Sequence, residues 1–323
     1  MTIMNSILVL GVMGLLFGVI LAYAAKKFAV EMDPKVEAVL AALPGANCGG
    51  CGFPGCGGLA NAIAEGSAPV NGCPVGGADT AAKVGEIMGV AASGVDKKVA
   101  KVICKGTCSN AKEKFIYEGV QDCKAAAMLG GGSKACGAGC LGLGTCVNVC
   151  KFDAIKVEDG VAVIDEEKCV ACGQCLEACP KSVIDWKPYK NGVVVDCNNV
   201  QFGKEVKSKC TVGCIGCQIC VKACPFDAID FENNLAKINY DKCTQCQVCV
   251  AKCPTKAISG DLSKVRKVDI EEEKCIGCTI CKKNCKFDAI EGELKQKHTI
   301  DKDKCAGCHS CVEKCPKKAI KIQ

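Results

Sequence analysis

The beginning of the chain is apolar and free of charge. No charged residue precedes Lys26, and residues 7–25 are almost wholly apolar. Because about 20 apolar residues span a bilayer as a helix, residues 1–27 are predicted to form a single transmembrane anchor. A cleaved signal peptide is the alternative, but no lysine or arginine precedes the apolar run, where a signal peptide would carry one. The pair Lys26 and Lys27 after the run predicts a single-pass protein of the cytoplasmic (inner) membrane, with its remaining domains on the cytoplasmic side.

Beyond the anchor, apolar residues come in shorter groups. Residues 33–43 have them at helical spacing after an Asp-Pro start, which predicts a helix. Further on, three copies of Phe-Asp-Ala-Ile alternate with Val-Ile or Ala-Ile pairs, and residues 156–164 have the pattern of a β-hairpin with a glycine in its turn. The alternation indicates an internal repeat of paired units. It predicts three α+β modules in series, over residues 133–190, 205–262 and 270–323.

Cysteine gives each repeat its chemistry. The chain contains 33 cysteines among 323 residues, and most follow the spacing Cys-x2-Cys-x2-Cys-x3-Cys. Followed by proline, this spacing is the bacterial ferredoxin run, in which three thiolates bind one 4Fe-4S cluster and the fourth binds the other cluster of a pair. Complete runs begin at Cys169, Cys214, Cys243 and Cys305, and the run at Cys275 lacks only the proline.

In each pair of runs, the fourth cysteine of one run is expected to bind the cluster held by the first three cysteines of the other run. This rule predicts the ligands of the clusters in the three modules. The opening run of the first module is irregular, because Leu143 stands where a middle cysteine is expected. The predicted sets are Cys136, Cys140, Cys146 and Cys179 (cluster 2); Cys150, Cys169, Cys172 and Cys175 (cluster 3); Cys214, Cys217, Cys220 and Cys253 (cluster 4); Cys224, Cys243, Cys246 and Cys249 (cluster 5); Cys275, Cys278, Cys281 and Cys315 (cluster 6); and Cys285, Cys305, Cys308 and Cys311 (cluster 7).

Another group of cysteines precedes the modules, in a glycine-rich segment. Cys48, Cys51, Cys56 and Cys73 are predicted to hold cluster 1, within a four-cysteine domain over residues 28–85. A structural zinc is the alternative, but such sites usually combine two Cys-x2-Cys pairs and only one is present here. The chain is therefore expected to bind seven 4Fe-4S clusters.

Five cysteines remain outside these sets: Cys104, Cys108, Cys123, Cys197 and Cys210. The first three lie in residues 86–132, predicted as a linker or cysteine-containing segment. They would supply three ligands of an eighth cluster, completed by Cys136, Cys197 or Cys210. Buried free thiols are an equally good interpretation.

Charge and composition exclude several other functions. Four thiolates around an oxidised cubane carry about −2, so seven clusters change the formal charge of +6 to about −8. A single arginine, Arg266, and 4% aromatic residues argue against nucleic-acid binding. A disulfide scaffold does not suit a cytoplasmic chain with this cysteine spacing. No catalytic residue and no flavin or nicotinamide site is evident, and His309, between Cys308 and Cys311, is expected to be a solvent-facing loop residue and not a ligand.

The order of these features resembles a known family. An N-terminal anchor, the segment from Asn47 to Cys56 with Cys73 and Pro74, and ferredoxin modules together resemble the B subunit of the Rnf complex. The stretches 136–146 and 212–217 resemble the form found in anaerobic bacteria. The resemblance covers essentially the whole chain, although shorter members of the family have one ferredoxin module where this chain has three.

The resemblance implies a function in electron transfer. It identifies the chain as a subunit of a membrane-bound, Na⁺- or H⁺-transporting ferredoxin:NAD⁺ oxidoreductase, which takes electrons from reduced soluble ferredoxin. The implied partners are the membrane subunits of the complex, its NADH- and flavin-binding subunit, and the bilayer. One alternative is an iron-sulfur subunit of another membrane redox enzyme, such as a hydrogenase. The other is a zinc-loaded structural module.

Overall fold

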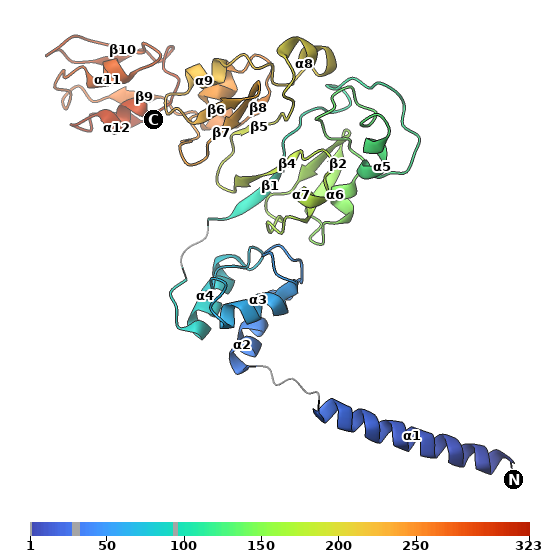
Figure 1. Cartoon of the computed structure of the whole chain (residues 1–323). Coiled ribbons are helices and arrows are strands. Elements are labelled where there is room, and N and C mark those ends of the chain that lie inside the picture. The colour runs from blue at the N-terminus through green and yellow to red at the C-terminus, as the bar shows by residue number, and fades with distance from the viewer. Residues whose placement is uncertain (1, 28–32, 93–95) are drawn as a thin grey trace. The chain divides into compact units, whose positions relative to one another are not determined.

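The computed structural model describes residues 2–27, 33–92 and 96–323. The chain divides into two compact units, one ending at Ser93 and the other beginning at Gly94. The first unit is helical, and the second combines short helices with two-stranded sheets (Figure 1). The α+β class expected from the sequence is confirmed.

The first unit begins with the helix expected from the apolar run, α1 (Thr2–Lys27). Its segment Ile7–Ala24 has a mean hydropathy of 2.6, and its apolar side chains are exposed. By length and composition the helix is able to cross a bilayer. Lys26 and Lys27 lie in its last turn, where positive charge interacts favourably with the carbonyl end of the helix dipole.

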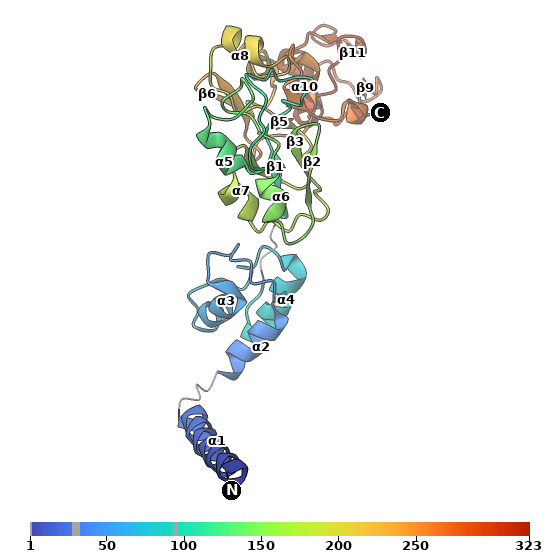
Figure 2. The same ribbon diagram turned by 90° about the vertical axis from the view of Figure 1, so that its right-hand side faces the viewer.

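Three further helices pack around one apolar core in this unit (Figure 2). They are α2 (Pro34–Ala42), α3 (Gly55–Ala64) and α4 (Gly77–Met88). The predicted start of α2 is confirmed, because the Asp33 side chain accepts a hydrogen bond from the Lys35 amide at 2.8 Å. Val39, Leu59 and Val84 are at most 1% exposed and form the centre of this core.

The second unit contains three modules of the same design. Module 1 comprises β1 (Lys98–Val102), α5 (Cys123–Met128), α6 (Thr145–Asn148), β2 (Ile155–Glu158), β3 (Val161–Ile164), α7 (Gln174–Ala178) and β4 (Ile184–Pro188). Module 2 comprises β5 (Val194–Val195), α8 (Gly203–Lys209), α9 (Ile219–Ala223), β6 (Ile229–Glu232), β7 (Leu235–Ile238), α10 (Val248–Lys252) and β8 (Ile258–Ser259). The 3-10 turn η1 (Leu262–Lys264) precedes module 3, which comprises β9 (Val268–Ile270), α11 (Ile280–Asn284), β10 (Ile290–Glu291), β11 (Thr299–Ile300), α12 (Ser310–Lys314) and β12 (Ile320–Ile322).

Each module pairs its first strand with its last and has a second two-stranded sheet between them. The antiparallel pairs are β1 with β4, β5 with β8 and β9 with β12, and the inner pairs are β2 with β3, β6 with β7 and β10 with β11. The predicted hairpin over 156–164 is confirmed by the β2–β3 register. Asp159 and Gly160 both have positive φ, 45° and 71°, as a type I′ turn requires.

The modules begin earlier than the sequence repeat indicated. β1, β5 and β9 start before residues 133, 205 and 270, respectively. Residues 86–132, predicted as a linker or cysteine-containing segment, therefore also include β1, the first strand of module 1. The strand β1 was missed because its partner is distant in sequence, Lys98 pairing with Pro188, so no local pattern marks it.

Candidate metal centres

The cysteine runs fold into loops that turn twice through the left-handed region. The residue just before the second cysteine and the one just after it have positive φ in these runs, for example Ala171 at 57° and Gly173 at 83° in the run beginning at Cys169. Gln218, Gln247, Thr279 and His309 adopt φ near 60° at the second of these positions without being glycine. Such residues cost roughly 1–2 kcal/mol each, and strain of this kind concentrates at functional sites. The third cysteine then enters a short helix and is buried.

Three of the predicted ligand sets each surround one cavity. Each of these cavities has an empty volume of about 350 Å³, part of it open to solvent. The sets are those of cluster 3 (Cys150, Cys169, Cys172, Cys175), cluster 6 (Cys275, Cys278, Cys281, Cys315) and cluster 7 (Cys285, Cys305, Cys308, Cys311). The structure thus brings together thiols from two different runs, in the exchanged arrangement expected for paired clusters.

The thiols of clusters 4 and 5 are also neighbours. Burial raises the pKa of Cys220 to about 11, and the nearby thiols of Cys214, Cys217 and Cys253 act in the same direction. Burial likewise raises the pKa of Cys249 to about 12, with smaller effects from the thiols around it. These neighbours are Cys246, Cys243, Cys220 and Cys224. The sets predicted for clusters 4 and 5 are therefore each assembled in space.

The cysteines predicted to hold cluster 1 lie between α2 and α4, with Cys56 in the first turn of α3 and the other three in the flanking loops. Burial raises the pKa of Cys73, with smaller effects from Cys56 and Cys51, so these three thiols are close together. Asn47 shapes this loop, because its Oδ1 accepts a hydrogen bond from the Cys56 amide at 2.8 Å. Asn47 itself has a φ of 46°. Cys48 follows it directly in the same loop.

The structure differs from the sequence prediction at cluster 2. A cavity of about 330 Å³ is lined by Cys123, Cys140, Cys146 and Cys179, without Cys136. The pKa of Cys146 is raised to about 12 by burial and then by Cys140, Cys123 and Cys179. Cys123 stands in the position that the sequence analysis gave to Cys136.

A polar chain fixes Cys123 at this cavity. Asp122 caps α5 by accepting hydrogen bonds from the amides of Lys124 and Ala125, and it also accepts one from the Thr145 hydroxyl at 2.8 Å. The Thr145 hydroxyl oxygen in turn accepts a hydrogen bond from the Cys123 amide at 2.6 Å. The side chain of Asp122 thereby joins the start of α5 to the start of α6. In the sequence, the N-cap residue Asp122 directly before Cys123 is a local signal for the position of this cysteine at the start of α5.

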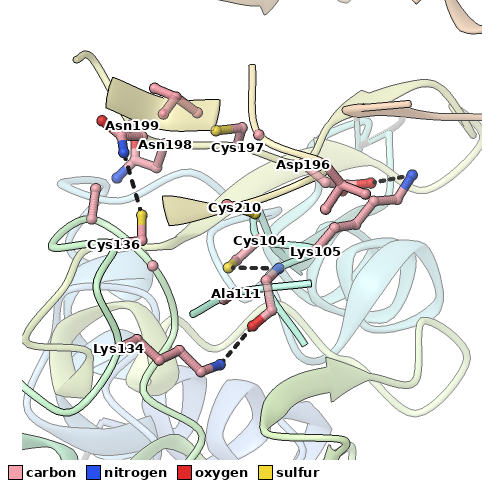
Figure 3. Close-up of a pocket in the computed structure, with 16 residues that line it drawn as sticks. Cys104, Lys105, Ala111, Lys134, Cys136, Asp196, Cys197, Asn198, Asn199 and Cys210 are labelled. Carbon is pink, nitrogen blue, oxygen red and sulfur yellow. Dashed lines mark hydrogen bonds and ion pairs between the residues drawn. The ribbon is translucent and has the colours of Figure 1, made fainter. Parts of the chain in front are cut away.

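The remaining unassigned cysteines do not form the eighth site that the sequence suggested. Cys123 belongs to the cavity just described, and Cys108 is exposed. Cys104 instead lines a further cavity together with Cys136, Cys197 and Cys210 (Figure 3). The set Cys104, Cys108 and Cys123 is therefore not brought together.

Backbone amides point at many of the cysteine sulfurs. Hydrogen bonds of 3.3–3.5 Å run from Gly76 to Cys73, Ala100 to Cys169, Ala162 to Cys140, Ala228 to Cys224, Ala289 to Cys285, His298 to Cys275 and Ala319 to Cys315. Such bonds stabilise negative charge on sulfur and tune the potential of a bound cluster. His298 is buried with its Nδ1 3.9 Å from the Cys275 sulfur. His309 is exposed and bonds the carbonyl of Arg266 through its Nε2.

The sites fit a four-thiolate cluster chemically. Among the described residues, no three cysteine, histidine or carboxylate groups lie close enough together to hold one metal ion. The thiols stand around cavities with little polar lining, and amide donors face the sulfurs. Thiolates, burial and hydrogen bonds to sulfur are the features by which proteins hold iron-sulfur clusters and set their potentials.

Comparison with protein families agrees with this chemistry. Residues 43–75 match the family described as "Putative Fe-S cluster", and residues 162–185 match the 4Fe-4S binding domain. Residues 213–257, 242–289 and 268–322 match 4Fe-4S dicluster domains.

Similar proteins are B subunits of one kind of complex. The B subunit of the Na⁺-translocating ferredoxin:NAD⁺ oxidoreductase complex of Acetobacterium woodii is 54% identical over 264 residues, 80% of this chain and 79% of that protein. The proton-translocating counterpart of Clostridium ljungdahlii is 44% identical, over 75% of this chain and 86% of that protein. The B subunit of the ion-translocating oxidoreductase complex of Methanosarcina acetivorans is 45% identical, over 75% of this chain and 92% of that protein. The chain belongs to the family of Rnf complex B subunits, the iron-sulfur electron-transfer subunits of ion-translocating ferredoxin:NAD⁺ oxidoreductases.

Proposed function

We propose that this chain binds 4Fe-4S clusters at the seven four-cysteine sets described above and relays electrons from reduced ferredoxin to the membrane subunits of its complex. The ligands are those predicted from the sequence, except that Cys123 takes the place of Cys136 at cluster 2. The observation that carries the proposal is the gathering of four thiols around single cavities at clusters 2, 3, 6 and 7. A bound cluster of this kind takes up and releases one electron.

The contribution of the protein is to hold, bury and connect these sites. Buried third cysteines and apolar neighbours exclude water, and amide donors stabilise charge on sulfur. Modules 2 and 3 are joined close to their ligands, because the Lys286 ammonium donates to the carbonyl of Cys224 at 2.9 Å. The thiols of Cys246 and Cys308, from clusters 5 and 7, are also near enough to affect each other electrostatically. These contacts support a connected series of sites across the two modules.

Helix α1 is proposed to anchor the chain in the bilayer without cleavage. Its exposed apolar surface suits lipid, and Lys26 and Lys27 at its end favour an orientation with the iron-sulfur domains on the cytoplasmic side. An intact-mass measurement on protein extracted from membranes tests this. The mass of the full chain is expected, whereas a mass lacking the apolar segment would identify a signal peptide.

Metal analysis after anaerobic purification is the direct test of cluster binding. Four iron atoms and four sulfides per site predict at least about 28 of each from the seven sites. Reduced ferredoxin should then bleach the brown absorbance. Zinc with little sulfide would contradict the proposal and favour a structural zinc protein.

The place of cluster 1 in the electron path is testable in the assembled complex. Cys51→Ala should remove one 4Fe-4S signal and slow electron transfer to the membrane partners, while dithionite still reduces the modules. Cys108→Ala is the matched control, because Cys108 is exposed and belongs to none of the four-thiol sets. Normal reduction of the partners in Cys51→Ala would place cluster 1 outside the path.

A further inference from the structure

Four cysteines outside the seven sets converge on one cavity in the second unit. Cys104 follows β1, Cys136 lies in the loop before α6, Cys197 follows β5 and Cys210 ends α8. The cavity has an empty volume of about 420 Å³, part of it open to solvent, which compares with 330–350 Å³ at clusters 2, 3, 6 and 7. Figure 3 shows the four sulfur-bearing side chains around it.

Long-range backbone pairing holds these cysteines in place. The amide before Cys104, that of Ile103, donates to the Val183 carbonyl at 2.8 Å. The amide before Cys136, that of Ala135, donates to the Lys112 carbonyl at 2.7 Å. Cys210 forms an antiparallel bridge with Ala111, and the adjoining amides extend this pairing. The amide before Cys197, that of Asp196, donates to the Ala257 carbonyl at 2.8 Å. The backbone at all four cysteines is therefore held by contacts between residues far apart in sequence.

All four sulfurs receive N–H donors, as the ligands of the ferredoxin runs do. Cys104 accepts hydrogen bonds from the amides of Gly106 at 3.3 Å and Cys140 at 3.4 Å. Cys136 accepts one from the Asn199 side-chain amide at 3.4 Å. The backbone amides of Asn199 and Cys214 approach Cys197, and those of Val212 and Gly213 approach Cys210. This concentration of donors suits sulfur that carries negative charge.

A buried cation without a carboxylate partner lies at the same cavity. Lys134 is 3% exposed, and its ammonium donates to the carbonyls of Gly106 and Gly160, both at 2.6 Å. None of the ion pairs among the described residues involves Lys134, while Asp196 at the cavity edge already faces Lys105 at 3.5 Å. A buried charge needs a compensating charge. Four thiolates around a cubane, with a net charge of about −2, would supply it.

The remaining lining is small and apolar. Ala111, Ala138, Val206 and Val212 face the cavity. A Cβ at Gly139 would lie 3.5 Å from the Cys136 sulfur and 3.7 Å from that of Cys104, and so would fill the space between them. Glycine at this position leaves that space open for a bound group.

We propose that Cys104, Cys136, Cys197 and Cys210 bind an eighth 4Fe-4S cluster, which connects modules 1 and 2. The inference rests on the proposed function at the other seven sites. Two backbone amides place this site between clusters 2 and 4. The amide of Cys140, a ligand of cluster 2, donates a hydrogen bond to Cys104, and the amide of Cys214, a ligand of cluster 4, approaches Cys197. The eighth cluster would accept one electron from the cluster on one side and pass one electron to the cluster on the other side, so that its own oxidation state is restored after each transfer. Eight sets of four include every one of the 33 cysteines except the exposed Cys108.

The iron and sulfide content of the wild-type chain is the first test, because it does not depend on the folding of a variant. Fully loaded protein should contain about 32 iron atoms and 32 sulfides, four per site. About 28 of each would overturn the eighth site and leave the proposed function intact. Absence of sulfide would overturn both. One zinc per chain beside 28 iron atoms would assign the four thiols to zinc and also overturn the eighth cluster.

Variants then locate the site. Cys197→Ser should lose about four iron atoms and four sulfides, together with one electron from the reductive titration with dithionite. Cys108→Ser should retain the wild-type content in the same preparation. An unchanged iron content in Cys197→Ser, or an equal loss in Cys108→Ser, would overturn the assignment.

Discussion

The amide of Cys140 donates a hydrogen bond to the sulfur of Cys104 at 3.4 Å. Cys140 lines the cavity of cluster 2, and Cys104 lines the cavity between modules 1 and 2. The two four-thiol sites are thus separated by one residue's backbone. Both cysteines belong to residues 98–146, the part of module 1 that departs from the regular ferredoxin spacing. These residues therefore contribute to the junction between module 1 and module 2.

The exchange of Cys136 for Cys123 at cluster 2 predicts a distinctive pattern of iron loss. Cys123→Ser and Cys136→Ser should each remove about four iron atoms, and the double variant should remove about eight, because the two thiols serve different sites. If Cys136 were a ligand of cluster 2, Cys123→Ser would lose no iron. Iron and sulfide analysis of the three variants distinguishes the two assignments.

The difference between the ligands predicted from the sequence and those proposed from the structure has a structural cause. The ferredoxin runs could be identified from sequence because three ligands of each cluster lie within seven residues and the repeat supplies the fourth. Cys104, Cys136, Cys197 and Cys210 come from four separate segments, so their spacing carries no signal. The same limitation applies to β1. Its partner strand is β4, and even the two paired residues closest in sequence, Val102 and Ile184, are separated by most of module 1.

Local apolar patterns predicted α1 and α2 of the first unit more directly, whereas α3 and α4 were not predicted. α1 and α2 depend on local apolar spacing and on capping by Asp33, both of which are visible in the sequence. The helices around the cysteines are only four or five residues long in most runs, and they are formed by turns with positive φ. Neither length nor composition identifies helices of this kind.

Lys134 is expected to affect both stability and redox potential. Lys134→Met removes a buried ammonium that bonds the carbonyls of Gly106 and Gly160, and each hydrogen bond from a charged donor contributes about 1.5–3 kcal/mol. Loss of positive charge beside an anionic cluster also disfavours a further electron, so one potential should shift to more negative values by tens of millivolts in order of magnitude. Potentiometric EPR titration measures the shift.

A suitable control for this variant is Lys156→Met. The Lys156 side chain is 70% exposed and pairs with Glu158, which is 53% exposed. Solvent screening therefore leaves its removal little effect on stability or on a cluster potential. Equal shifts in the two variants would show that the position of Lys134 has no special electrostatic role.

Gly142 is predicted to be essential where the cluster 2 loop meets the β2–β3 turn. Its φ is 73°, and a Cβ would overlap the backbone carbonyl of Gly160. Gly142→Ala should therefore lower the stability of module 1 by at least about 2 kcal/mol, from backbone strain and overpacking together. Gly137→Ala is the control, because nothing lies within 4 Å of its Cβ position and its φ is not positive. The midpoint of iron release on heating should fall for Gly142→Ala alone, and equal midpoints for the two variants would contradict the packing argument.

The membrane anchor is testable by placing charge on its exposed apolar surface. Leu15 and Leu16 are 72% and 55% exposed in α1, and an arginine at the centre of a spanning helix costs about 2.5–3.5 kcal/mol. The double variant Leu15→Arg, Leu16→Arg, expressed without partner subunits, should leave the membrane pellet on carbonate washing. Leu294→Arg, at a site 67% exposed in module 3, should remain in the pellet like the wild type. Retention of the double variant would mean that surfaces other than α1 hold the chain on the membrane.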